Sequence, residues 1–188
     1  PTQLGWISGV YQTGVRSDSY YSEDGKQPAS VWLRGEKLSE VSAFLGTDNG
    51  AIVSGKTVEN WFNKAVAPSG AGLGNAPRKD SVPGFDLTFC APKSVSLLWG
   101  MGADSDVRGI VDEAHQAAVS QALDYLSEHA GYTRKQVKEP AGKRLVVEKL
   151  AGISGVKYEH RTSRAGDPHV HSHVLLANKQ LCRDGRVR

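Results

Sequence analysis

The chain has 188 residues, a formal net charge of +3 and 39% hydrophobic residues. This length and apolar content are typical of one compact domain with a sizeable core, and the mildly basic balance permits a polyanionic partner without indicating one. No run approaches the roughly 18 apolar residues of a membrane span, and the two cysteines form no CxxC pair, so we predict a cytoplasmic protein.

The first part of the chain predicts an aromatic-rich segment, two short helices and a loop. Residues 1–34 are rich in tyrosine and tryptophan, and the strand-like sequence PASVWLRG ends at Gly35. Apolar residues recur at helical spacing over 36–47, and a second short helix is predicted from Thr57, as its cap, to Pro68. Residues 68–84 contain four glycines and three prolines, so we predict a flexible loop there.

The second part of the chain predicts an antiparallel sheet beside a long helix. FDLTFCA at 85–91 alternates apolar and polar side chains, which is typical of a strand with one polar face. Apolar residues at helical spacing over 105–131 predict the longest helix. Two strands joined by a glycine-containing turn are predicted over 143–163, and a further long strand over 169–188. We therefore predict an α+β domain with a central antiparallel sheet.

Four of the six histidines lie within HRTSRAGDPHVHSHV at 160–174. In a strand, His169, His171 and His173 point to one face, and His160 near the end of the preceding strand can fold onto it. Three imidazoles on one face suit zinc, manganese, nickel, copper or iron and leave coordination positions open. The alternative is that these histidines form a polar strand face and hydrogen-bond to the backbone. We predict a two-layer domain with this metal site on one sheet face and helices packed on the other.

Asp86 lies on the polar face of the strand at 85–91, and aspartate is uncommon in strands. A histidine that binds a metal usually donates its other ring N–H to a carboxylate or carbonyl oxygen. Asp86 is the best candidate for that role, ahead of Glu159 and Asp167, which are better explained as a surface charge and a turn residue. The alternative for Asp86 is an ordinary exposed strand residue.

Tyr20 and Tyr21, within SDSYYSEDG, are candidate nucleophiles beside such a site. A phenol with a pKa of about 10 attacks only where a metal, a base or positive charge favours its phenolate. A tyrosine pair alone is weak support for catalysis, because most such pairs serve packing or stacking.

Four blocks of the chain resemble, in order, the relaxase domain of conjugative plasmids of the MobF class, a TrwC/TraI-like family within the HUH endonucleases. They are SDSYYSEDG with VWLRG near the start, PGFDLTFCAPKSVSLLWG at 83–100, EAHQAAVSQALDYLSEHAGYTR at 113–134, and EHRTSRAGDPHVHSHVLLAN at 159–178. The second and fourth blocks are highly specific. The resemblance implies that residues 1–188 form one relaxase domain, a DNA strand transferase, within a longer protein.

The activity implied by this resemblance is metal-dependent, site- and strand-specific nicking and rejoining of plasmid DNA at an origin of transfer. A tyrosine attacks the scissile phosphate, which gives a 5′-phosphotyrosine link and a free 3′-hydroxyl. The resemblance assigns Asp86 to orienting a ligand and does not require His169. It implies a divalent metal ion of the Mg, Mn, Zn or Ni type, with these ligands: His160, His171 and His173.

The nucleophile stays open among three tyrosines. The family commonly carries two tyrosine clusters near its N-terminus. Tyr20 and Tyr21 match the second cluster, whereas Tyr11 alone represents the first.

Single-stranded DNA at a nick site is the implied partner, together with accessory relaxosome proteins and a coupling protein, without membrane insertion. Basic residues in the motif segments are candidates for contact with phosphate, with ordinary surface charge as the alternative for each: Lys93, Arg134, Arg161 and Arg164.

Two other functions are consistent with such a metal site. The first is a hydrolytic metal phosphodiesterase, in which metal-bound hydroxide takes the place of tyrosine. The second is a non-catalytic module for single-stranded DNA binding or replication initiation, whose histidines hold a structural metal.

Overall fold

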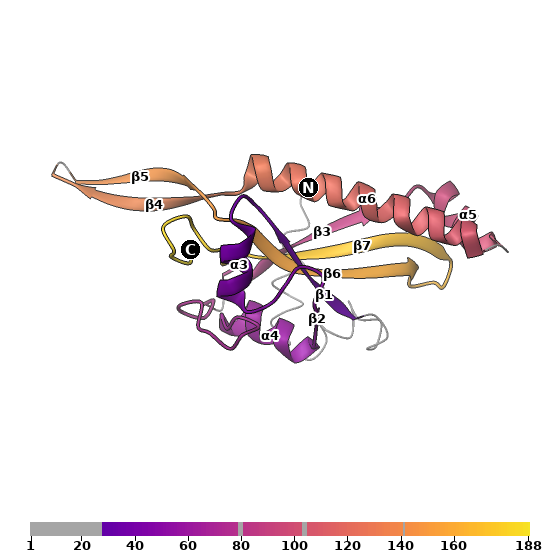
Figure 1. The fold of residues 1–188 in the computed structure, drawn as a ribbon, viewed down its shortest axis with the longest axis horizontal. Coiled ribbons are helices and arrows are strands. Elements are labelled where there is room, and N and C mark those ends of the chain that lie inside the picture. The colour runs from indigo at the N-terminus through magenta and orange to yellow at the C-terminus, as the bar shows by residue number, and fades with distance from the viewer. Residues whose placement is uncertain (1–27, 79–80, 103–104, 141) are drawn as a thin grey trace.

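The computed structural model describes residues 28–78, 81–102, 105–140 and 142–188 (Figure 1). A five-stranded antiparallel sheet with the strand order β2-β1-β6-β7-β3 lies at the centre of this part of the chain. The bounds of its strands are β1 Ala29–Arg34, β2 Ile52–Val53, β3 Gly84–Cys90, β6 Ile153–Thr162 and β7 Pro168–Ala177. The antiparallel sheet predicted from the sequence is therefore confirmed.

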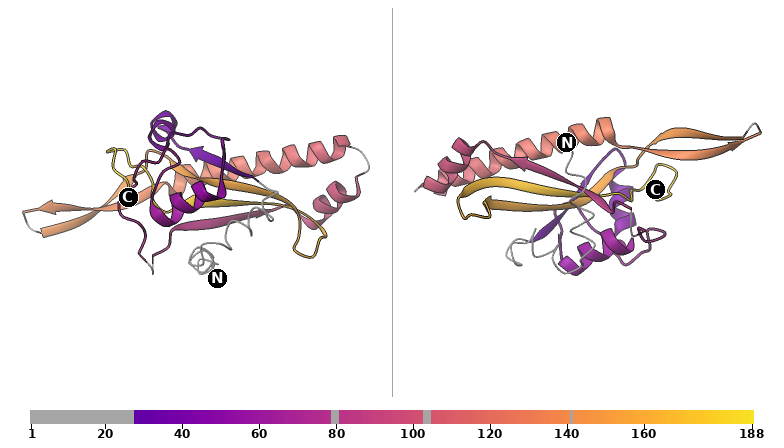
Figure 2. Two further views of the ribbon diagram at one scale, coloured as in Figure 1. Left: turned by 90° about the horizontal axis from the view of Figure 1, so that it is seen from below. Right: turned by 180° about the vertical axis from the view of Figure 1, so that it is seen from behind.

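Helices flank this sheet on both faces, and a separate hairpin extends from it. The helices are α3 Leu38–Leu45, α4 Gly55–Lys64, α5 Lys93–Met101 and α6 Ser105–Ala130, and the hairpin strands are β4 Tyr132–Glu139 and β5 Gly142–Lys149. Figure 2 shows the hairpin projecting beyond the body of the domain, directly after the end of α6. No helix among the described residues is long and apolar enough to cross a bilayer.

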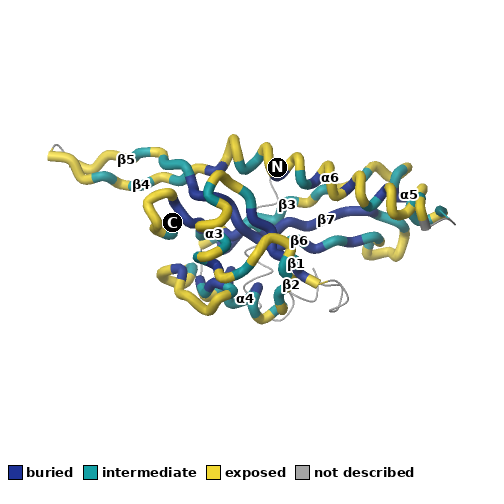
Figure 3. The backbone as a smooth tube through the Cα atoms, in the orientation of Figure 1, coloured by how far each residue is buried: buried dark blue, intermediate teal, exposed yellow. Residues whose placement is uncertain are grey.

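The period-two alternation of the strands divides the apolar residues between two cores. On one face, Val31 and Leu33 of β1 and Val156 and Tyr158 of β6 pack with α3 and α4, whose buried side chains include Trp61. The opposite face packs against α6 through a second cluster that includes Trp32, Val119, Leu123, Ile153 and Val174. The central strands β6 and β7 are consequently buried along most of their length (Figure 3).

Helix α6 occupies the face that the sequence predicts for helices, opposite the histidines. Helices α3 and α4 instead cover the histidine-bearing face, further along the strands, because that face turns apolar at Tyr158 and Leu175. Figure 1 shows α6 on one side of the sheet and α3 and α4 on the other.

Three local predictions differ from the structure. Helix α4 begins earlier than expected, because the Ser54 side chain accepts a hydrogen bond from the backbone N–H of Thr57 and is the N-cap. Strand β4 was not predicted, since its polar side chains are mostly exposed and give no apolar alternation. The long strand predicted over 169–188 ends at Ala177, and a turn with an isolated bridge between Leu181 and Val187 follows.

The segment between α4 and β3 contains an isolated bridge from Val66 to Gly72, and its Leu73 side chain lies in the core. The flexibility predicted for 68–84 stays a prediction. In the centre of the sheet, Gly155 allows β6 and β7 to pair closely, because a Cβ at this position would lie 2.1 Å from the carbonyl oxygen of Leu175.

Candidate metal centre

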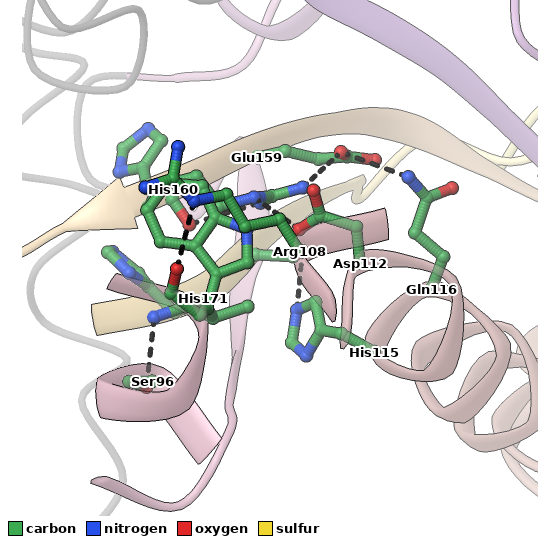
Figure 4. Close-up of polar contacts among 12 residues, drawn as sticks. Ser96, Arg108, Asp112, His115, Gln116, Glu159, His160 and His171 are labelled. Atoms are coloured by element: carbon green, nitrogen blue, oxygen red, sulfur yellow. Dashed lines mark hydrogen bonds and ion pairs between the residues drawn. The ribbon is translucent and has the colours of Figure 1, made fainter. Parts of the chain in front are cut away.

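The pairing of β6 with β7 brings three histidines onto one face of the sheet. His160 of β6 stands directly opposite His171 of β7, and His173 stands opposite Tyr158. Residues directly opposite each other in an antiparallel pair point to the same face. Potential ligand atoms of His160, His171 and His173, hereafter the histidine cluster, lie within 4.8 Å of one another. This spacing is close to what one bound ion requires. The ring centroids of His160 and His171, both labelled in Figure 4, lie 4.9 Å apart.

The histidine cluster is largely shielded from solvent, with relative exposures of 5%, 8% and 6% for His160, His171 and His173. Loss of hydration lowers the pKa of His171 to about 4, and the neighbouring imidazoles act in the same direction. His171 is therefore neutral near pH 7, with a ring nitrogen lone pair available to a metal.

Two hydrogen bonds orient the rings of this cluster. The Nδ1 of His173 lies 3.0 and 3.1 Å from the two carboxylate oxygens of Asp86, and the Nδ1 of His171 lies 2.8 Å from the carbonyl oxygen of His169. Carboxylate and carbonyl oxygens accept hydrogen bonds, so each Nδ1 carries the proton and donates it. The Nε2 atoms of both rings are thereby left with their lone pairs, which is the usual arrangement in a metal site.

Asp86 comes from β3, where it shares the polar face with Thr88. Thr88 stands opposite His173, and its hydroxyl lies 3.2 Å from His173 Nδ1. The position of Asp86 is the one that its predicted role requires, while the role itself stays a prediction. Three buried imidazoles, two of them oriented through Nδ1, fit a divalent metal ion.

His169 lies beside the histidine cluster but is not part of it. Its ring stacks on that of His171, with centroids 4.4 Å apart and an interplanar angle of 21°. The group of atoms close enough to share an ion does not include His169. Its contribution to the site is its backbone carbonyl, which fixes the tautomer of His171.

The basic residues predicted to contact DNA lie in different places. Lys93 of α5 forms an ion pair with Asp167 in the connection from β6 to β7, and Arg164 lies exposed in the same connection. Arg134 is exposed on the β4–β5 hairpin. These three residues do not meet at the histidine cluster.

Arg161 differs from the other three because it points to the face opposite the histidine cluster. Its Nε lies 2.7 Å from Asp112 Oδ1 of α6, and its Nη2 donates to Glu159 Oε2 over 3.1 Å. Burial acts to raise the pKa of Glu159, but Lys157 and Arg161 together lower it below its usual value. The structure therefore does not support Arg161 as a phosphate contact near the cluster. Strand alternation from His160 could have placed it on this face from the sequence.

The predicted nucleophiles Tyr11, Tyr20 and Tyr21 lie outside the described residues. Their position relative to the histidine cluster therefore stays a prediction.

A second group of potential ligands, Glu148, Cys182 and Asp184, was not predicted from the sequence. Arg188 lies 3.1 Å from a Glu148 oxygen and 2.7 Å from an Asp184 oxygen, and Lys135 lies 3.0 Å from the other Glu148 oxygen. Two cations already neutralise these carboxylates, so this group is an ion-pair cluster that joins the hairpin to the chain after β7.

The fold and the histidine cluster together define a domain of the relaxase class. The family model described as TrwC relaxase matches residues 8–188. The chain therefore belongs to the TrwC relaxase family, which confirms the resemblance found in the sequence.

Individual relatives agree with this assignment. The multifunctional conjugation protein TraI of Escherichia coli is 36% identical over 102 residues, which is 51% of this chain and 5% of that protein. A copper-bound structure of the conjugative relaxase TrwC in complex with oriT DNA is 27% identical, with a TM-score of 0.64, and the match covers 98% of this chain and 57% of that one. A metal-bound TrwC–oriT structure is 26% identical, with a TM-score of 0.61 and coverages of 98% and 56%. The chain thus spans only part of the length of these relatives.

Removing the ring of His171 should disrupt the metal site, whereas removing that of His169 should not. We expect His171→Gln to weaken Zn²⁺ binding by more than the roughly 10–100-fold that follows loss of a residue orienting a ligand. The matched variant His169→Gln keeps its backbone carbonyl, so its Zn²⁺ affinity should stay within about 3-fold of wild type. Competition titration against a chromophoric chelator measures both, and equal losses in the two variants would contradict this ligand set.

Replacing Asp86 with alanine should weaken Zn²⁺ binding by roughly 10–100-fold, because His173 then loses the acceptor that holds its ring. The same chelator titration measures the effect. Asp167→Ala is a suitable control, since that carboxylate pairs with Lys93 on the surface. An unchanged affinity in Asp86→Ala would refute the orienting role.

Proposed function

We propose that this chain nicks and rejoins one strand of plasmid DNA at an origin of transfer by tyrosine transesterification. The observation that carries the proposal is the histidine cluster, buried and oriented by Asp86, in a chain that matches the TrwC relaxase family over residues 8–188. Relatives of this family have been captured with oriT DNA and with bound metal, which supports DNA as the substrate.

The chemistry divides between the metal and the protein. A divalent ion held by the histidine cluster would withdraw charge from the scissile phosphate and lower the barrier to in-line displacement. The phenolate oxygen of Tyr11, Tyr20 or Tyr21 forms a bond to phosphorus, and the bond from phosphorus to the 3′-oxygen breaks. The phenol proton leaves to solvent or a base, and the 3′-oxygen takes up a proton. Because the phosphotyrosine ester retains the energy of the phosphodiester, a 3′-hydroxyl can reverse the step and reseal the strand.

The donor set favours zinc, nickel, copper or iron over magnesium as the physiological ion. Magnesium prefers an octahedral set of oxygen ligands, whereas imidazole nitrogen suits the other ions, and manganese accepts both kinds of donor. The cluster offers three imidazole nitrogens, and a metal held by three protein ligands keeps positions for phosphate oxygens.

The β4–β5 hairpin supplies a second contact to DNA in this proposal. Lys138 stands opposite Lys143 on one face of the hairpin, which also carries Arg134, and none of the three has an ion pair with a described residue. Like charges directly opposite each other destabilise an antiparallel pair. The negative charge of a DNA phosphate backbone over this face would offset that repulsion between the two lysines. A two-stranded ribbon also fits the major groove, and exposed Leu145 and Val147 lie on the same face for contact with base edges.

Accessory relaxosome proteins and a coupling protein belong to the same proposal, as does action in the cytoplasm. We further propose that residues 1–188 are the strand-transferase part of a longer protein. The Escherichia coli relative, of which the match covers 5%, is named as a multifunctional conjugation protein.

Single replacement of Tyr11, Tyr20 and Tyr21 by phenylalanine should identify the nucleophile. Incubating each variant with oriT-type single-stranded DNA and Mn²⁺, followed by denaturing electrophoresis, should show the covalent adduct lost in one or two variants and kept in the rest. The linked tyrosine is then read by mass mapping of the DNA-bound peptide.

Other outcomes of this experiment favour the two alternative functions. Release of a free 5′-phosphate without any protein-linked strand would favour a hydrolytic phosphodiesterase. Tight DNA binding without cleavage by wild type, at any divalent ion, would favour a non-catalytic binding module.

Removing the unpaired cations of the hairpin should weaken DNA binding in a salt-dependent way. We expect the double variant Lys138→Ala, Lys143→Ala to lower affinity for a hairpin oligonucleotide and to reduce the slope of log K against log salt by roughly 2. Arg144→Ala is the control, because Arg144 lies on the other hairpin face and pairs with Glu139 at 2.7 Å. Fluorescence anisotropy at several salt concentrations measures both, and equal slopes would remove the hairpin from the proposed interface.

A further inference from the structure

A β-bulge lies directly beside the histidine cluster. Between the pairs His160–His171 and Thr162–Pro168, β6 advances by two residues while β7 advances by three. One extra residue of β7 is therefore accommodated opposite Arg161. Bulges of this kind bend the strand and change the direction of neighbouring side chains. The bulge thus adjoins the point where the ring from β6 meets the rings from β7.

Arg161 holds the bulge from the side of α6. Its Nη1 donates to the carbonyl oxygen of His160 over 3.1 Å, its Nε lies 2.7 Å from Asp112 Oδ1, and its Nη2 reaches Glu159. The Arg161 side chain is 18% exposed and the Asp112 side chain 31%. Figure 4 shows Asp112 on α6 and Glu159 on β6, with dashed contacts converging between them. One planar guanidinium therefore connects the backbone of a cluster histidine to the long helix.

Ser96 holds the bulge from the side of α5. The backbone N–H of Val170, next to the cluster on β7, donates to Ser96 Oγ over 3.1 Å, and the carbonyl oxygen of Val170 accepts from Ala91 N–H over 2.9 Å. Ser96 is fully buried. A buried donor without a partner is costly, so this contact fixes the backbone at the point where the ladder is interrupted.

We infer that the Arg161–Asp112 ion pair, together with Ser96, positions His160 relative to His171 and thereby sets the geometry of the metal centre. We refer to these three residues as the bulge clamp. The inference rests on the metal centre of the proposed function. The clamp residues touch neither metal nor substrate in this account. They act through the backbone of the cluster.

The energetics of buried ion pairs support a positioning role. A largely buried ion pair contributes little net stability compared with a well-packed apolar pair of similar volume, because both charges lose hydration. Apolar contacts already hold this face of the sheet to α6 through Val119 and Leu123. The hydrogen bond from Arg161 Nη1 adds what apolar packing does not provide, namely a defined position for the His160 carbonyl.

The spectrum and affinity of bound Co²⁺ test the clamp without any need for DNA cleavage. We expect Arg161→Met to weaken Co²⁺ binding about 10-fold and to change the visible absorption bands, which report ligand geometry. Arg161→Lys keeps the charge but loses the planar fork, so it should show a smaller change in the same direction. Asp112→Asn should resemble Arg161→Lys, and combining Arg161→Met with Asp112→Asn should weaken binding no further than Arg161→Met alone.

Lys157→Met is the matched control. Lys157 lies on the same face of β6 and pairs with Glu159 at 2.6 Å, and among the described residues its ammonium group has no hydrogen bond to the backbone of the cluster. The Lys157→Met variant should lower the thermal midpoint of the metal-free protein about as much as Asp112→Asn does. Its Co²⁺ affinity and spectrum should stay those of wild type. Changes in Co²⁺ binding as large in Lys157→Met as in Arg161→Met would overturn the inference.

Two further outcomes separate the clamp from the metal centre itself. If His171→Gln abolishes Co²⁺ binding while Arg161→Met, Arg161→Lys and Asp112→Asn all bind as wild type does, the clamp is refuted and the metal centre stands. If His171→Gln binds Co²⁺ as wild type does, the metal centre fails and the proposed function with it. Should Arg161→Met lose its far-ultraviolet circular dichroism, the Arg161→Lys and Asp112→Asn variants decide the question alone.

Discussion

The register between β6 and β7 is the constraint on which the rest of this domain depends. Opposition of His160 to His171 places imidazoles from two strands on one face, and the same register buries Tyr158 and Leu175 further along. A slip by one residue would move the histidines to the α6 face and the core residues with them. Metal site and hydrophobic core are therefore specified by one set of backbone hydrogen bonds.

The two faces of the sheet serve different purposes near the cluster. The histidine face carries Asp86 and Thr88 of β3, whose short polar side chains contact the Nδ1 of His173 and orient its ring. The opposite face is closed by α6, where His115 lies 3.0 Å from the Ser172 hydroxyl. Burial lowers the pKa of His115, with the charge of Arg161 acting in the same direction, so this ring is a neutral hydrogen-bonding group. The proposed metal ligands lie on one face of the sheet, and Arg161, which is proposed to position them, lies on the other.

Much of this arrangement could be predicted from short-range patterns. Alternation over 85–91 predicts both the strand and the face of Asp86, and the spacing of His171 and His173 predicts a shared face. Spacing alone placed His169 on the same face as His171 and His173 and allowed His160 to join them. The family resemblance chose His160 over His169, because a register between two strands is not visible in either one. The placement of α3 and α4 on the histidine face, and of Arg161 against Asp112, depends on packing between residues distant in the sequence, which local periodicity does not contain.

Helix α6 connects the region of the histidine cluster to the β4–β5 hairpin, so its length fixes the distance between them. From Asp112, which is tied to the cluster, to Ala130, where the hairpin follows, this helix rises by about 27 Å. That distance corresponds to roughly eight base steps of about 3.4 Å. Under the proposed function, in which the hairpin contacts a duplex and the cluster acts on the strand beyond it, α6 would set the distance between these two contacts.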